Sequence, residues 1–117
     1  MARVRCITEM GMGVDVRGGD NTKAARRAVS DAIRHSSLGF FRIVGQTAHD
    51  LKIDVLIGVP SPETVDTVAV AAELPYGAVN VRVERGGLSV PPQGEGDPII
   101  IASAAVLVHL DLDDGPG

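Results

Sequence analysis

The sequence predicts one α/β domain in which strands and helices follow the order β-α-β-α-β-β. Apolar and polar residues alternate at 3–10, 53–59 and 78–84, which is the pattern of half-buried strands. Residues 99–110 are apolar almost throughout and predict a strand buried on both faces. We therefore expect a mixed four-stranded sheet of α/β (α+β) type with two helices on one face.

Each predicted helix has a recognisable start. Asp20 or Asn21 can cap a first helix whose apolar residues keep helical spacing, and this helix is expected to end near Ser36. Ser61-Pro62-Glu63 predicts the start of the second helix, because a hydroxyl can accept hydrogen bonds from free backbone N–H groups and proline suits the first turn. Pro75 ends that helix. The short αβ units predict parallel strands with right-handed crossovers, and the last two strands can pair as a hairpin.

This order of elements resembles the chorismate-mutase-like fold, which the small YjgF-type deaminases share. The resemblance implies trimers with active sites between subunits. Two helices cover only one face of the sheet, whereas residues 99–110 are apolar on both faces. We therefore expect a homo-oligomer, a trimer or larger, in which another subunit covers the second face.

Length and composition set outer limits on function. The chain has 117 residues, which predicts a single domain at 1–113 followed by a flexible acidic tail at 114–117. One cysteine and no apolar leader favour a reducing cytoplasm, and the longest apolar stretch is too short to cross a membrane. A net charge of -4 and 3% aromatic residues argue against nucleic-acid binding.

A glycine-rich segment at 11–23 is the densest functional signal. Glycines let a ligand approach the backbone, and the start of the following helix presents free N–H groups to an anion. The segment is not a Walker A loop, because Gly19-Asp20 stands where that loop has Lys followed by Ser or Thr. The alternative interpretation is a glycine turn that only connects strand to helix.

Within this segment Gly11, Gly13, Asp15 and Gly18 match the pattern G-x-G-x-D-x-H-G. The chain thereby resembles a small family of bacterial and plastid proteins of unknown function, the listerial-type conserved hypothetical proteins. The resemblance extends over nearly the whole chain. Arg17 stands where that family has histidine, and because arginine stays protonated we do not expect a general base at this position.

The segment also supplies candidate site residues. A lysine beside carboxylates suits proton transfer, and an arginine can bind a carboxylate or phosphate through two hydrogen bonds. The catalytic candidates are Glu9, Asp15 and Lys23. The ligand-binding candidates are Gly11, Gly13, Arg17, Gly18, Asp20, Thr22 and Arg82. Asp20 has a second interpretation as a helix cap alone.

The histidines do not have the spacing of metal ligands, so neither a metal nor a cofactor is expected. Ser103, the one hydroxyl in 99–110, is expected in the core with a backbone partner. The leading hypothesis is a small oligomeric enzyme that performs ring opening, isomerisation or deamination of a polar or anionic small molecule by acid-base chemistry. The alternative is a noncatalytic metabolite-binding or assembly protein that uses the same glycine-rich loop.

Overall fold

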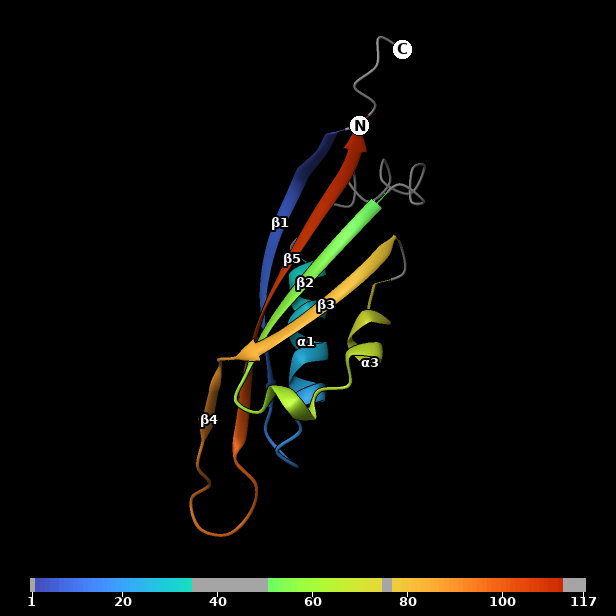
Figure 1. Cartoon of the computed structure of the whole chain (residues 1–117). Helices are drawn as coiled ribbons and strands as arrows, with labels where there is room; N and C mark the ends of the chain where they lie inside the picture. Colours follow the sequence, from blue (N-terminus) through green and yellow to red (C-terminus); the bar gives the residue numbers. More distant parts are fainter. Residues whose placement is uncertain (1, 35–50, 75–76, 113–117) are drawn as a thin grey trace.

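The computed structural model describes residues 2–34, 51–74 and 77–112. They form a sheet with helices on one side of it (Figure 1). The predicted tail at 114–117 lies outside the described residues. The elements are β1 (Ala2–Asp15), α1 (Asn21–Arg34), β2 (Leu51–Val59), the 3-10 turn η2 (Pro62–Thr64), α3 (Thr67–Ala71), β3 (Ala78–Arg85), β4 (Leu88–Val90) and β5 (Ile99–Leu112).

The sheet is mixed, as predicted, but the last two predicted strands are not neighbours in it. The order is β1-β5-β2-β3, with β4 paired to β5. β5 runs antiparallel to both β1 and β2, and only β2 and β3 are parallel (Figure 1). The hairpin predicted between residues 78–84 and 99–110 is therefore wrong, because β2 lies between these strands. A strand that is apolar on both faces is most stable in the middle of the sheet, and β5 takes that place.

The described residues contain five strands rather than the four predicted. The additional strand, β4, has three residues and forms an antiparallel hairpin with the start of β5. Alternation of apolar and polar residues over so short a run carries almost no signal, so the sequence pattern did not reveal it. Gly87, with a φ of 63°, provides the turn between β3 and β4.

The second predicted helix is split in two. Ser61 makes no side-chain cap, and the first turn ends at Val65, whose backbone is extended. Asp66 instead caps α3 by accepting hydrogen bonds from the N–H groups of Val68 and Ala69. The hydroxyl of Thr22, in the first turn of α1, accepts from Asp66 N–H at 2.9 Å and donates to Thr64 O at 3.3 Å. These tertiary hydrogen bonds stabilise a break in the helical conformation, whereas the local spacing predicts a continuous helix.

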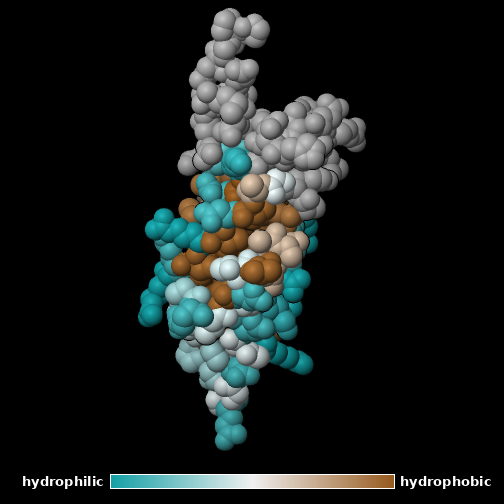
Figure 2. Space-filling view, turned by 45° about the vertical axis from the view of Figure 1, so that its right-hand side comes forward, coloured by the Kyte–Doolittle hydropathy of each residue, from teal (hydrophilic) through white to brown (hydrophobic). Residues whose placement is uncertain are grey.

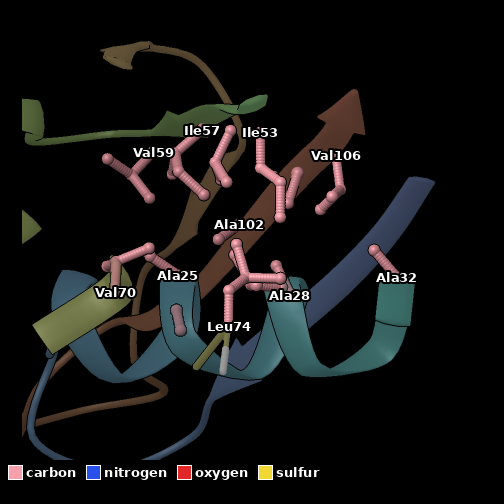
Figure 3. Packing of buried hydrophobic residues seen from close by; sticks show 14 of the residues in the cluster. Ala25, Ala28, Ala32, Ile53, Ile57, Val59, Val70, Leu74, Ala102 and Val106 are labelled. Carbon is pink, nitrogen blue, oxygen red and sulfur yellow. The ribbon is translucent and has the colours of Figure 1, made fainter. Parts of the chain in front are cut away.

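The core lies between the sheet and the two helices (Figure 3). α1 contributes mainly alanines, and the strands contribute β-branched side chains. Small side chains let the helix axis approach the sheet closely, so a thin layer of valine and isoleucine fills the space. The central members are Ala25, Ala28, Val29, Ala32, Ile53, Val55, Ile57, Val59, Ala102 and Val106.

Gly11 and Gly13 belong to β1, so the prediction that the glycine-rich loop begins at residue 11 is wrong. Both glycines lie directly under α1. A Cβ on Gly11 would collide with the backbone of Ala28 and Ala32, and a Cβ on Gly13 would collide with the backbone of Ala24 and Ala28. The close approach of strand and helix therefore requires glycine at both positions.

None of the helices in the described ranges is long and apolar enough to cross a membrane. The molecule measures 65 × 25 × 18 Å along its principal axes. Helices pack against one face of the sheet alone, and the opposite face carries no described helix (Figure 1). We call this second face the open face. Its central residues are Met10, Met12, Leu56, Ser103, Ala105 and Leu107.

Candidate functional site

The junction between β1 and α1 is a loop of five residues, 16–20. Gly18 and Gly19 have φ angles of 91° and 58°, a region that side chains with a Cβ rarely adopt, so this turn needs glycine. Gly19 lies beside Asp97 and Pro98, which precede β5. The loop therefore packs against another part of the chain on one side and faces solvent at Arg17.

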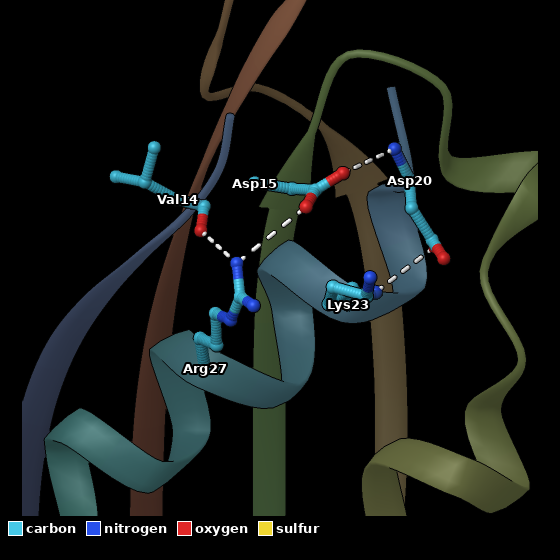
Figure 4. A network of polar contacts seen from close by, with 5 residues as sticks. All are labelled: Val14, Asp15, Asp20, Lys23 and Arg27. Atoms are coloured by element: carbon cyan, nitrogen blue, oxygen red, sulfur yellow. Dashed lines mark hydrogen bonds and ion pairs between the residues drawn. The ribbon is translucent and has the colours of Figure 1, made fainter. Parts of the chain in front are cut away.

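Asp15 ends β1, and its carboxylate organises this junction (Figure 4). The residue is only 2% exposed. One carboxylate oxygen accepts a hydrogen bond from the Asp20 N–H at 2.9 Å, and the other lies 3.5 Å from Nη1 of Arg27. The same guanidinium donates to the carbonyl oxygen of Val14 at 2.6 Å. A buried charge with an ion-pair partner and a backbone donor is a structural anchor for the turn.

The remaining polar candidates of the junction lie at the start of α1 or just before it. Asp20 caps the helix, because its side chain accepts from Lys23 N–H at 3.0 Å (Figure 4). Thr22 bridges α1 to the segment between η2 and α3. The side chains of Arg17 and Lys23 are exposed, and neither forms an ion pair within the described residues. These two cations are the part of the junction that is free to meet an anion.

A hollow of about 300 Å³ borders the junction on the solvent side of α1. Lys23, Arg26, Arg27, Ser30 and Glu73 line it. Glu73 pairs with Arg26 at 2.7 Å, and Asp15 pairs with Arg27, so Lys23 adds the charge that is left over. The hollow is therefore cationic by one charge.

The structure separates other predicted site residues from this junction. Glu9 lies six positions before Asp15 on the same strand, and at the rise of a β-strand this separates the two residues by about 20 Å. Arg82 is on β3, which forms the opposite edge of the sheet from β1, and it pairs there with Glu84 at 3.1 Å. Neither Glu9 nor Arg82 can act on the same atom as Asp15.

A second hollow, of about 400 Å³, lies on the open face and was not predicted from the sequence. Gly58, Ser103 and Ala105 are small residues in its lining, and Met10 and Leu56 are larger ones. Ser103 is exposed here, so its predicted place in the core is wrong. The strand parity explains the difference, because Ala102 and Ala104 face the helices and turn Ser103 to the other side. A run of small residues within 101–105 is the only sequence signal of this hollow.

Among the described residues, no group of three or more metal-ligating side chains comes together. His109 lies on β5, and its Nε2 is 3.4 Å from a carboxylate oxygen of Asp54 on β2. This nitrogen is buried and makes no hydrogen bond within the described residues. His35 and His49 lie outside the described residues.

Comparisons with known proteins agree with the family that the sequence suggested. A family model described as "Conserved hypothetical protein (Lin0512_fam)" matches residues 5–108. The chain belongs to this family. A solved structure from Nostoc punctiforme PCC 73102, described as an FtsZ-like protein of unknown function, is similar to it at 40% identity and a TM-score of 0.83. That match covers 96% of this chain and 99% of the other. Among curated proteins no significant match is found.

Proposed function

We propose that this member of the Lin0512 family is a noncatalytic assembly protein in which a second copy of the chain covers the open face. The observation that carries the proposal is the exposure of large apolar side chains where no described helix packs. Met10 is 70% exposed, Met12 61% and Leu56 38%. A contiguous patch of exposed apolar side chains usually marks a site of interaction with another molecule.

The border of the open face favours a second copy over a partner of one charge sign. Lys52 and Asp54 lie at one end of β2, and Arg82 and Glu84 lie on β3. Both signs are thus present around an apolar middle, which is the usual anatomy of a protein interface. Figure 2 shows hydrophobic side chains gathered in the middle of one side of the molecule with hydrophilic ones around them. A surface of this kind can complement another surface of a second copy of the chain.

The number of subunits and the location follow the expectations from the sequence. A trimer or larger oligomer is the form that we propose at micromolar concentration. A cytoplasmic location is proposed with it, since the sequence has a single cysteine and no internal disulfide is possible.

Sedimentation of two matched variants tests the assembly. Leu56→Glu places a charge in the middle of the open face and should weaken association at least about tenfold, because burying an unpaired carboxylate costs well over 1.4 kcal/mol. Val68→Glu is the control, since Val68 is 78% exposed on α3 in the helix layer. A wild-type chain that stays monomeric at micromolar concentration, or a Leu56→Glu chain that associates like the control, contradicts the proposal.

The junction at 16–23 supports a second candidate function, the binding of a polar or anionic small molecule. The supporting observations are two exposed cations, Arg17 and Lys23, the second of which also lines the hollow of about 300 Å³ and gives it its surplus positive charge. Acid-base catalysis at Glu9, Asp15 and Lys23 stays a prediction. The geometry gives it less support, because Asp15 is buried and already paired and Glu9 lies far along the strand.

Arg17→Ala tests this second candidate with inorganic phosphate and citrate as probes. If the junction binds anions, the variant should lose about 1.5–3 kcal/mol of binding free energy in calorimetric titrations, the range for hydrogen bonds to charged groups. Its unfolding free energy should change little, since an exposed arginine contributes little to folding. Equal binding by wild type and variant removes Arg17 from the site.

A further inference from the structure

We propose that the outer edge of β3 is a second contact between copies of this chain, in which two β3 strands pair antiparallel around Val83. The proposed function places a second copy over the open face, whereas this contact extends the sheet sideways and does not require the open face. A two-fold contact of this kind joins two single chains or two larger assemblies. It is supported by the unequal protection of the two sheet edges, the direction of the β3 peptide groups and the charges beside Val83.

The sheet has two long outer strands, β1 and β3, and α1 protects the first of them. On β1 the N–H of Met12 donates to a carboxylate oxygen of Asp31 at 3.0 Å. The carbonyl oxygen of Val14 accepts a hydrogen bond from Arg27 at 2.6 Å. Side chains of α1 therefore occupy backbone groups of β1 that would otherwise be free to pair with another strand.

The outer edge of β3 has no such protection in the part of the chain that the structure describes. None of the described side chains forms a hydrogen bond with the β3 backbone. The strand contains neither proline nor lysine, and its register with β2 has no shift. Proline, lysine and bulges are common means of blocking an exposed strand edge. β3 is thus an open edge at the margin of the sheet (Figure 1).

The backbone hydrogen bonds show which peptide groups of β3 face outward. The N–H of Gly86, just after the strand, donates to the carbonyl oxygen of Val59 on β2 at 2.9 Å. Bonding residues alternate along a parallel strand, so every second residue before Gly86 bonds to β2 in the same way. The N–H and C=O groups of Val81, Val83 and Arg85 therefore point away from the sheet. A second β3 strand centred on Val83 would give all three residues hydrogen-bond partners.

The valines of β3 would gain cover from this pairing. Val79, Val81 and Val83 face the helix layer and are half-buried, whereas the residues that pair with them on β2 are buried. A valine at the edge has a neighbouring strand on one side only, so a further strand removes apolar surface from water. Centring the pair on Val83 places this side chain directly beside the partner's Val83.

The charges select this register. Arg82 and Glu84 are exposed on the opposite side of β3 and pair with each other at 3.1 Å. With Val83 at the centre, Arg82 lies opposite the partner's Glu84, and Glu84 lies opposite the partner's Arg82. Opposite charges in cross-strand positions stabilise a sheet, whereas like charges destabilise it. A centre at Arg82 would place two arginines opposite each other, and a centre at Val81 would leave Glu84 opposite the partner's Ala78.

Charge reversal tests the register by sedimentation. Arg82→Glu and Glu84→Arg each place like charges opposite one another, so each should weaken edge association about tenfold. A 1:1 mixture of the two variants restores both Arg–Glu pairs between unlike chains and should associate about as tightly as wild type. The double variant Arg82→Glu/Glu84→Arg is the matched control and should also associate like wild type. A mixture that associates no better than either single variant overturns the proposal.

Hydrogen exchange detects the paired peptide groups. Between about 5 and about 500 µM protein, exchange of the Val81 and Val83 amides should slow about tenfold as the edges pair. The amides of Arg82 and Glu84 already bond to β2, so their exchange is the internal reference. Val83→Pro should abolish the slowing at Val81, because proline is tolerated where the N–H faces outward but cannot donate. Equal exchange of Val83 in wild type at both concentrations overturns the proposal, whether or not the proline variant folds.

The same measurements separate this contact from the proposed function. An oligomer whose Val83 amide stays unprotected contradicts the edge contact and leaves the open-face assembly in place. Slowed exchange at Val83, in a protein whose Leu56→Glu and Val68→Glu variants associate alike, contradicts the open-face assembly and leaves the edge contact in place.

Discussion

Asp15 stabilises the turn between β1 and α1, although its carboxylate also suggested a catalytic role. Its carboxylate is buried, accepts the Asp20 N–H and lies beside Arg27. A carboxylate in this position satisfies a backbone donor at the start of α1, which would otherwise lack a partner. Aspartate at the end of β1 therefore determines where the strand stops and the helix begins.

We predict that substitutions of Asp15 act on stability. Asp15→Ala should lower the free energy of unfolding by about 1–3 kcal/mol, because the Asp20 N–H loses its acceptor in a part-buried place. Asp15→Asn should cost about 1 kcal/mol, since the amide oxygen can still accept while the ion pair is lost. Urea denaturation measures both, with the exposed Glu95→Gln as control. An Asp15→Ala protein as stable as wild type would show that the turn does not depend on this carboxylate.

At the scale of elements, the glycines of β1 explain why this strand and α1 lie so close together. Gly11 and Gly13 are two residues apart, so both face the helix from the same side of the strand. Ala24, Ala28 and Ala32 are spaced by one helical turn and face them. Small residues at matching periods of 2 and about 4 allow the two backbones to touch.

A methyl group at this contact should be strongly destabilising. Gly13→Ala is expected to cost about 3 kcal/mol or more, or to prevent folding, because the new Cβ meets backbone atoms of α1 that cannot turn aside. Gly94→Ala is the reference: its φ is 104° but its surroundings are open, so strain alone should cost about 1–2 kcal/mol. Thermal melts compare the two. A Gly13→Ala protein that melts with or above Gly94→Ala would contradict the packing argument.

At the scale of the whole molecule, the helices that the structure describes cover only one face of the sheet. The core between the sheet and α1 consists largely of alanine and valine, which bury little area each. The apolar middle of the open face is of the same kind as that core, and covering it would add a second apolar layer. The proposed assembly supplies this layer.

Stability should therefore depend on protein concentration. An oligomer that forms only from folded chains raises the melting temperature as concentration increases, by a few degrees for each tenfold step in a domain of this size. Calorimetry from 1 to 100 µM, roughly the range where such interfaces fill, should show this rise for wild type and for Val68→Glu. Leu56→Glu should show a flat dependence, and a flat wild-type curve would count against assembly.

The sequence by itself determined most of the elements of this protein, whereas the tertiary structure decided how they meet, where the second predicted helix breaks and that β4 forms. Alternation at 53–59 and 78–84, helical spacing in 21–34 and the Gly86-Gly87 turn are local signals, because each depends on neighbours within a few residues. The place of β5 between β1 and β2 depends on partners far along the chain, and so does the break at Val65 that Thr22 stabilises. The burial of Asp15 and the hollow beside Ser103 arise only when distant strands and α1 come together. No local sequence pattern indicates which face of each strand will be covered in the folded protein.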